Sequence, residues 1–242
     1  MASNGPEQKL IATSGDLRAL LDTIDGLDIH PLEYYRWKPA PLCIDLKPVE
    51  LNGQDSIFIL PLFIHDADID TVYLVDILTL GAAAFSTAND TGTTLKGILE
   101  STTIPKMAFD VAEGKVALEQ QYDVSLALTK DLQVQELARP DKRPTAPGPK
   151  TKRRGPRPAP GPIALVGCVQ NVKEIEISER RAMVVADDDL RKLYDQTEGG
   201  EAAVFVQRPL KTELVRHCVD SVRFLPEIYE KYKYNHRPYY KT

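Results

Sequence analysis

Asp45 and Lys47 lie two residues apart in the stretch Leu-Cys-Ile-Asp-Leu-Lys, residues 42–47. If this stretch is a strand, both charged side chains lie on one face, and the leucines and isoleucine lie on the other. Two carboxylates at this spacing can offer a divalent metal ion two oxygen ligands. Here the second group is an ammonium. The pattern therefore indicates either an altered metal site or a surface salt bridge on an edge strand.

The densest positive charge lies in residues 139–162, which hold eight lysines or arginines, one aspartate and eight prolines. This segment carries +7 and the whole chain carries −5, so the remainder carries −12. Such a segment does not pack into a core, and we expect it to be extended and solvated. It could neutralise phosphates, act as a nuclear localisation signal or be a plain linker. Its candidate nucleic-acid-binding residues are Lys142, Arg143, Lys150, Lys152, Arg153, Arg154 and Arg157.

The composition fits one large domain with appendages, because 43% of the 242 residues are hydrophobic. The sequence contains no apolar run long enough to cross a membrane, so we expect no membrane contact. The N-terminus lacks the basic and apolar regions of a secretory signal. Cys43, Cys168 and Cys218 are far apart, which is typical of buried thiols rather than of disulfides or a zinc site. We therefore expect an intracellular protein, cytoplasmic or nuclear.

The hydrophobic pattern predicts the elements that must position Asp45 and Lys47. Three strands with short connections, at 42–48, 56–64 and 71–77, form an antiparallel meander. Two further strands, 104–109 and 124–128, alternate with helices and pair in parallel. We therefore expect a mixed α/β fold with a five-stranded sheet, three strands antiparallel and then two parallel, and helices on both faces. The expected helices are 14–25, 81–85, 93–99, 113–121, 131–137, 182–195 and 210–234, and Pro226 is expected to bend the last one.

Two details of these helices can be tested against the structure. Val116 and Leu118 are expected to face the core, and Asp131 is expected to cap the helix that follows it. The pattern also divides the chain into five segments. They are a disordered N-terminus (1–13), the first part of the domain (14–138), the basic insertion (139–162), the C-terminal helices of the same domain (163–234) and a tail (235–242).

Several short segments, in this order, resemble the 3′–5′ exonuclease domain of the ribonuclease D-like, DEDD superfamily. The resemblance covers residues 40–138 and resumes at 160–234. It implies an RNase H-like fold for the predicted sheet and helices. The segments that carry it are 72–81, 95–101, 104–111, 130–133, 208–210, 218–220 and 224–226.

The resemblance also implies a two-metal phosphodiester hydrolase. Its ions are held by four carboxylates, and a tyrosine orients the attacking water. Asp45 matches the first carboxylate. The other three carboxylate positions hold Lys47, Gly114 and Ser221, and His217 stands at the tyrosine position. One carboxylate of four remains, which favours an inactive site that holds no metal ion.

An active alternative uses the neighbouring acids Glu113 and Asp220 together with Asp45 to bind Mg²⁺ or Mn²⁺. One residue along a helix is a rotation of about 100°, which displaces a carboxylate further than metal coordination tolerates. Lys47 is the stronger objection. A positive charge about 4 Å from a divalent ion is repelled by about 8 kcal/mol at an effective dielectric constant of about 20. We expect Lys47 to pair with Asp45 and replace the metal.

Three functions are consistent with these patterns. The favoured one is an inactive exonuclease-fold protein that binds single-stranded RNA or DNA, or a protein partner. The second is an active metal-dependent 3′–5′ exonuclease with displaced carboxylates. The third is a scaffold or dimerisation subunit of an RNA-processing assembly. In the tail, Tyr239 and Tyr240 are candidates for contact with a partner.

Overall fold

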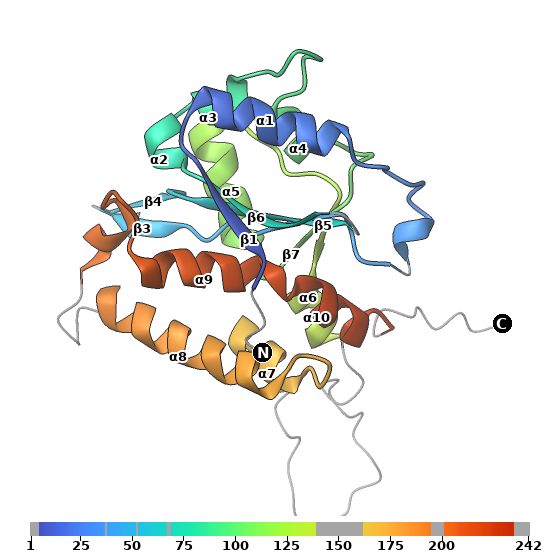
Figure 1. Ribbon diagram of the computed structural model, residues 1–242, viewed down its shortest axis with the longest axis vertical. Coiled ribbons are helices and arrows are strands. Elements are labelled where there is room, and N and C mark those ends of the chain that lie inside the picture. The colour runs from blue at the N-terminus through green and yellow to red at the C-terminus, as the bar shows by residue number, and fades with distance from the viewer. Residues whose placement is uncertain are drawn as a thin grey trace, which may run out of the picture.

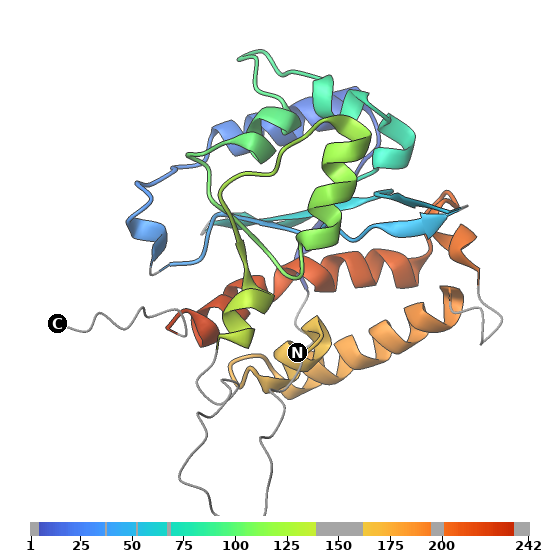
Figure 2. The same ribbon diagram turned by 180° about the vertical axis from the view of Figure 1, so that it is seen from behind.

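A computed structural model of the chain describes residues 5–36, 38–51, 53–66, 69–138, 162–194 and 201–234. These residues form a central β-sheet with helices on both faces (Figures 1 and 2). No helix in this part of the chain is long and apolar enough to cross a membrane. The mixed α/β class predicted from the sequence is confirmed.

The sheet has six strands in the order β1-β6-β5-β2-β7-β8. β5 runs antiparallel to both β2 and β6, whereas the β1–β6, β2–β7 and β7–β8 pairs are parallel. A separate hairpin of two short strands, β3 and β4, follows β2. The strands are β1 (Glu7–Ile11), β2 (Leu42–Ile44), β3 (Val49–Leu51), β4 (Gln54–Ser56), β5 (Leu60–Asp66), β6 (Ile69–Val75), β7 (Lys106–Ala108) and β8 (Thr129–Asp131).

The strand count corrects the predicted five-stranded sheet. Glu7–Ile11 were expected to be disordered, but they form the edge strand β1, parallel to β6. The first three of these residues are polar, so the hydrophobic pattern does not mark them as a strand. Main-chain pairing with β6 holds β1 in the sheet, and pairing of this kind depends little on side-chain polarity.

The last predicted strand is displaced along the chain. Residues 124–128 are a loop, and β8 begins at Thr129 instead. Leu128 has a φ of 45°, in the left-handed region, which interrupts an extended run before β8. Asp131 caps the next helix as predicted, because its side chain accepts from the amide of Gln133. Val116 was expected to face the core, but it is 52% exposed, whereas Leu118 is buried.

One face of the sheet is covered by the first five helices, and we call it the α1 face. Leu17, Leu21 and Ile24 of α1 pack here with Leu42 and Ile44 of β2. Thr13 caps α1 by accepting from the amide of Asp16. The helices are α1 (Ser14–Asp25), α2 (Ile77–Leu80), α3 (Ala83–Ser86), α4 (Leu95–Glu100) and α5 (Ala112–Tyr122).

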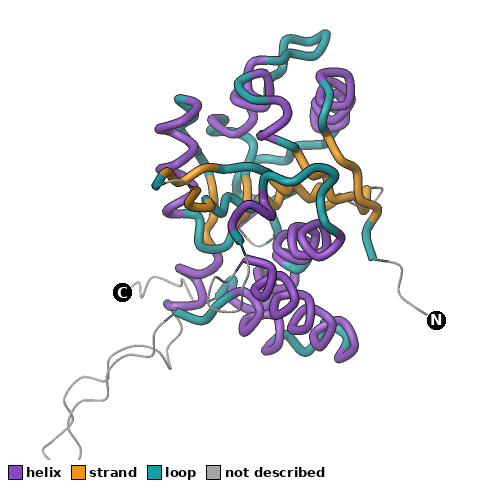
Figure 3. Tube along the Cα trace, turned by 90° about the vertical axis from the view of Figure 1, so that its left-hand side faces the viewer, coloured by secondary structure: helices purple, strands orange, loops and turns teal. Residues whose placement is uncertain are grey.

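The other face, which we call the α9 face, is covered by α9, and α8 packs on α9 as a further layer (Figure 1). Figure 3 shows the strands between the two groups of helices. The single helix expected over 210–234 is two helices, which meet at Phe224 ahead of Pro226. The elements are α6 (Leu132–Leu137), α7 (Leu165–Asn171), α8 (Ile177–Tyr194), α9 (Thr212–Arg223), α10 (Leu225–Tyr232) and the 3₁₀ turns η1 (Tyr34–Arg36) and η4 (Ala202–Phe205).

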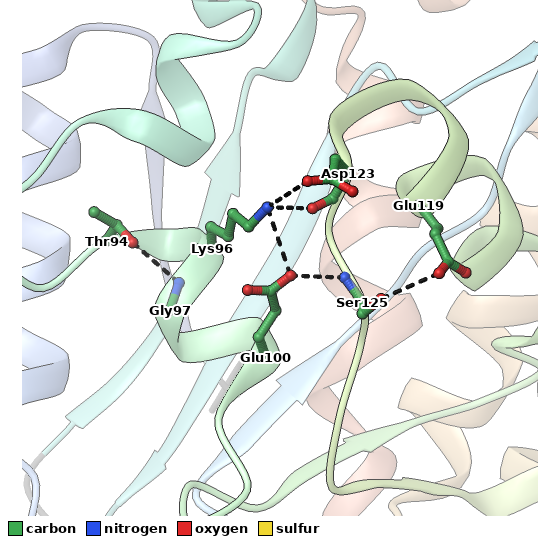
Figure 4. Close-up of polar contacts among 7 residues, drawn as sticks. All are labelled: Thr94, Lys96, Gly97, Glu100, Glu119, Asp123 and Ser125. Atoms are coloured by element: carbon green, nitrogen blue, oxygen red, sulfur yellow. Dashed lines mark hydrogen bonds and ion pairs between the residues drawn. The ribbon is translucent and has the colours of Figure 1, made fainter.

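A polar network fixes the end of α5 to α4 (Figure 4). The Lys96 ammonium donates to the main-chain oxygen of Asp123 and lies 3.2 Å from its carboxylate. Glu100 accepts from the amide of Ser125 at 2.9 Å, and the Ser125 hydroxyl donates to Glu119 at 3.1 Å. Asp123, in the left-handed conformation, ends α5. The network therefore anchors the helix that carries Gly114.

Candidate functional site

The positions selected from the sequence meet where β2 ends. Asp45 follows β2, and its amide donates to the carbonyl of Pro61 in β5 at 3.1 Å. Ser221 of α9 lies beside the Asp45 carboxyl group and acts to lower its pKa. The Ser221 hydroxyl also lies 2.9 Å from the Cys218 carbonyl, to which it donates. Gly114 of α5 touches the main chain of Leu46. Segments that are far apart in the sequence therefore converge on one site.

Asp45 is the retained carboxylate, and only 7% of its surface is exposed. Burial raises the pKa of Asp45, while the charge of Lys47 and the hydrogen bond from Ser221 act in the opposite direction. Burial therefore opposes ionisation of Asp45, and its two neighbours favour it.

The predicted ion pair between Lys47 and Asp45 is wrong. Lys47 is exposed, and its ammonium forms no ion pair within 4.0 Å of any described carboxylate, including that of Asp45. Its charge still reaches the site, because it acts on the pKa of both Asp45 and His217. Lys47 therefore adds positive potential to the site without forming the expected contact with Asp45.

Gly114 closes the position of the third carboxylate ligand. A β-carbon at residue 114 would lie 1.7 Å from the carbonyl oxygen of Leu46 and 2.5 Å from the Leu46 β-carbon. Real β-carbons essentially never come within 3.0 Å of another heavy atom. Because main-chain atoms of Leu46 are involved, rotation of a side chain cannot relieve the overlap. No side chain of any kind fits at residue 114 in this arrangement.

The two substitute acids do not reach the site together. Glu113 is exposed to solvent on α5. Asp220 is 5% exposed and is engaged on another side of α9, where it accepts from Arg223 at 2.7 Å. Arg223 also donates to Glu179 of α8 at 3.0 Å. Burial raises the pKa of Asp220, and the charge of Arg223 opposes this shift. Asp220 is therefore part of the α8–α9 contact.

His217 faces the same small cavity as Asp45 and Lys47. Burial, and then the charge of Lys47, lower the pKa of His217 to about 4. The cavity measures about 50 Å³, and Phe58 and Phe205 also line it. Ligand pockets usually measure about 300–1,000 Å³, and a water molecule takes up about 30 Å³. The cavity has room for water but not for a nucleotide.

These residues do not fit a pair of divalent metal ions. Among the described residues, no three histidine, cysteine, aspartate or glutamate side chains are grouped so that they could hold a metal ion. The third carboxylate position is closed by Leu46, and the last one holds the hydroxyl of Ser221. Asp45 is the one motif carboxylate at the site.

Sequence reasoning overlooked the residue that holds Phe205 at this cavity. Arg208 forms a bidentate ion pair with Asp76, in which both N–O distances are 2.6 Å. It also donates to the Phe205 carbonyl at 2.9 Å. Burial alone would raise the pKa of Asp76, but the donors from Arg208 and Thr79 hold it below its ordinary value. Arg208 and Asp76 lie in segments that carry the exonuclease resemblance, but their partnership is visible only in three dimensions.

The candidate nucleic-acid-binding residues of the basic insertion lie outside the described residues, as do the tyrosines of the tail. These assignments therefore stay predictions. The same is true of the proposed limits of the insertion and tail.

Comparisons with known proteins identify the fold. No family model and no curated protein matches the chain. The solved structure of Trypanosoma brucei ribonuclease D in complex with RNA U12 matches with a TM-score of 0.61 at 17% identity. The match covers 95% of this chain and 63% of that one. Escherichia coli ribonuclease D, described as an exoribonuclease involved in structured RNA processing, matches with a TM-score of 0.54 at 15% identity. That match covers 95% of this chain and 45% of that chain.

The EXO domain of Aedes aegypti Nibbler matches with a TM-score of 0.54 at 14% identity, over 95% of this chain and 88% of that chain. The chain thus spans less than two thirds of the trypanosomal protein and less than half of the bacterial one. Its fold is similar to that of these ribonuclease D and exonuclease domains, and the predicted RNase H-like architecture is confirmed.

Proposed function

We propose that this chain is a pseudo-exonuclease, a protein with the exonuclease-domain fold that binds single-stranded nucleic acid without cleaving it. The observation that carries the loss of activity is the contact between Gly114 and Leu46, which leaves no space for a carboxylate at residue 114. Two-metal hydrolysis requires carboxylates to hold both ions. At this site, Asp45 alone provides one.

Nucleic-acid binding is supported by two independent observations. The fold is similar to that of a ribonuclease D whose structure was solved with RNA. The chain also carries eight basic residues within residues 139–162, a density that favours phosphate contact through counterion release. The remainder of the chain is strongly acidic, so we place the contact on this segment.

A degradation assay tests the inactivity. Single-stranded RNA and DNA labelled away from the 3′ end are incubated with Mg²⁺ or Mn²⁺ and with either the wild type or Asp45→Ala. We expect no trimming by either protein. Metal-dependent trimming that Asp45→Ala abolishes would show an active exonuclease, with Glu113 and Asp220 as the remaining candidate ligands. Trimming that persists in Asp45→Ala would be assigned to a contaminant.

A gel-shift titration tests the binding. The wild type should shift single-stranded RNA at low ionic strength and lose affinity steeply as salt is added. Deletion of residues 142–157 should abolish the shift, whereas replacement of this segment by a neutral linker of equal length controls for chain length. If the wild type causes no shift at low salt, nucleic-acid binding is the part of the proposal to abandon. A role as a scaffold subunit then becomes the better candidate.

A further inference from the structure

Most of the charged side chains that line a groove on the α9 face are acidic. This groove lies between the β5–β6 turn and the helices α8–α10, and its volume is about 360 Å³. Its rim carries five carboxylates, from Asp66, Asp70, Glu174, Glu179 and Glu227. Buried apolar side chains also line it, among them Phe63, Ile175 and Phe224, all less than 9% exposed.

One guanidinium, that of Arg223, faces these carboxylates, and it already has partners. Arg223 donates to Asp220 at 2.7 Å and to Glu179 at 3.0 Å, so two carboxylates neutralise it. His65 also lines the groove, but burial lowers its pKa, with the nearby acids opposing the shift. The groove therefore holds a surplus of negative charge at neutral pH.

The acids repel one another across the groove. Burial raises the pKa of Glu227, and the negative charges of Glu179 and Asp70 add to this effect. One carboxylate oxygen of Glu227 is buried and has no hydrogen-bond donor among the described residues. A positively charged group placed in the groove would relieve the repulsion.

The shape of the groove favours an extended occupant. A second hollow of about 630 Å³ shares Gly5, Pro6, Glu179 and Arg223 with it and continues along α8 and α9. Val215 and Val219 line this continuation. A bare metal ion is a poor fit, because no three ligating side chains in the described structure are grouped to hold one. A nucleic acid would be repelled by the acidic rim.

We propose that this groove, the acidic groove, docks a segment of a partner protein in which arginine or lysine alternates with apolar side chains. The cationic groups would pair with the carboxylates, and the apolar groups would lie against Val215 and Val219, which are partly exposed. This site is separate from the cavity at Asp45, because the two share no lining residue. The proposal does not rest on nucleic-acid binding.

Fluorescence anisotropy of the full chain tests the docking. The probe is a labelled peptide in which arginines alternate with valines, and its matched control carries glutamine in place of every arginine. The groove variant is Asp70→Asn with Glu174→Gln, both at exposed positions. The control variant, Glu33→Gln with Asp90→Asn, removes the same charge from exposed positions elsewhere. Thermal melts confirm that both variants fold.

We expect the wild type to bind the arginine peptide and not the glutamine peptide. The groove variant should bind about tenfold more weakly, and the control variant should bind like the wild type. Equal weakening in both variants would show nonspecific attraction to an acidic protein and would overturn the proposal. Failure of the wild type to bind the arginine peptide, or equal binding of the glutamine peptide, would overturn it as well.

Two further measurements separate the other occupants. If deletion of residues 142–157 raises the affinity for the probe about tenfold or more, the chain's own basic segment competes for the groove. The assignment to a partner then fails. If sedimentation shows a dimer of the wild type that the groove variant dissociates, the occupant is a second copy and the assignment also fails. An unchanged affinity together with a monomeric wild type supports the partner.

Discussion

The main chain of Leu46 lies directly against Gly114, with 1.7 Å between the Leu46 carbonyl oxygen and the place where a β-carbon on residue 114 would stand. This contact joins the segment after β2, which holds the retained aspartate, to the helix where a further metal ligand is expected. Helix α5 therefore packs closer to β2 than a side chain at residue 114 would allow. Several consequences can be measured.

Gly114→Ala should destabilise the fold by about 3 kcal/mol, because the added methyl group overlaps main-chain atoms. Chemical unfolding would measure the change. Gly15→Ala is the matched control, since a β-carbon there meets its nearest neighbour at 3.7 Å and should be tolerated. A stability of Gly114→Ala within about 0.5 kcal/mol of the wild type would mean that α5 moves away from β2 easily.

Divalent cations should leave the melting temperature of the wild type unchanged. A ligand that binds only the folded state adds about 2.7 kcal/mol at one hundred times its dissociation constant. Differential scanning fluorimetry with Mg²⁺, Mn²⁺ and a chelator would detect such a gain.

The double variant Lys47→Glu with Ser221→Asp should fail to restore trimming of RNA, because residue 114 still lacks a carboxylate. Restored activity in this variant would contradict the importance of the Gly114 contact.

His217 should make stability depend on pH in a defined window. Its folded-state pKa is about 4, compared with an ordinary value of 6.5, so the unfolded chain binds more protons between these values. Stability from this group is complete above pH 6.5 and is lost as the pH falls towards 4, by at most about 3 kcal/mol. Asp187, at 3.8 Å, would reduce the loss by favouring the charged imidazole.

The raised pKa of a buried carboxylate such as Asp45 makes stability change with pH in the opposite direction. The contribution of His217 is therefore measured by comparing the wild type with His217→Asn. The variant should lose less stability than the wild type between pH 6.5 and 4. Parallel curves for the two proteins would show that the imidazole is not buried in its neutral form.

Arg208→Lys should destabilise the protein despite keeping the charge. A lysine cannot make both short contacts with Asp76 and also reach the Phe205 carbonyl. We expect a loss of about 2 kcal/mol, and about 4 kcal/mol for Arg208→Ala, which leaves the buried Asp76 unpaired. A double-mutant cycle with Asp76→Asn measures the coupling between the two residues. Additive losses would show that they act independently.

The sequence was a good guide wherever a side-chain pattern alone determines structure. The strands around Asp45, the cap at Asp131 and the convergence of Asp45 with Ser221 followed from spacing and from the exonuclease resemblance. The substitution of carboxylates by Lys47, Gly114 and Ser221 is visible in the sequence, but the physical closure of the site is not. It depends on how closely two main chains approach.

Contacts between distant segments account for the remaining differences. An ion pair between Asp45 and Lys47 was expected because they share a strand face, yet β2 ends at Ile44 and Lys47 turns to solvent. Asp220 looked like a neighbour of the site, but its rotation on α9 directs it towards Arg223. Neither outcome can be read from spacing without knowing where each element ends.

The edge strand β1 has a consequence for the order in which the chain is assembled. Each residue of β1 pairs with a partner 64 positions later, as Glu7 does with Thr71. During synthesis, β1 therefore has no partner until β6 has followed it, while β5 and β6 can pair at once across a short turn. Residues 7–11 thus complete the sheet late. A variant that lacks these residues would expose the edge of β6 to pairing with other molecules.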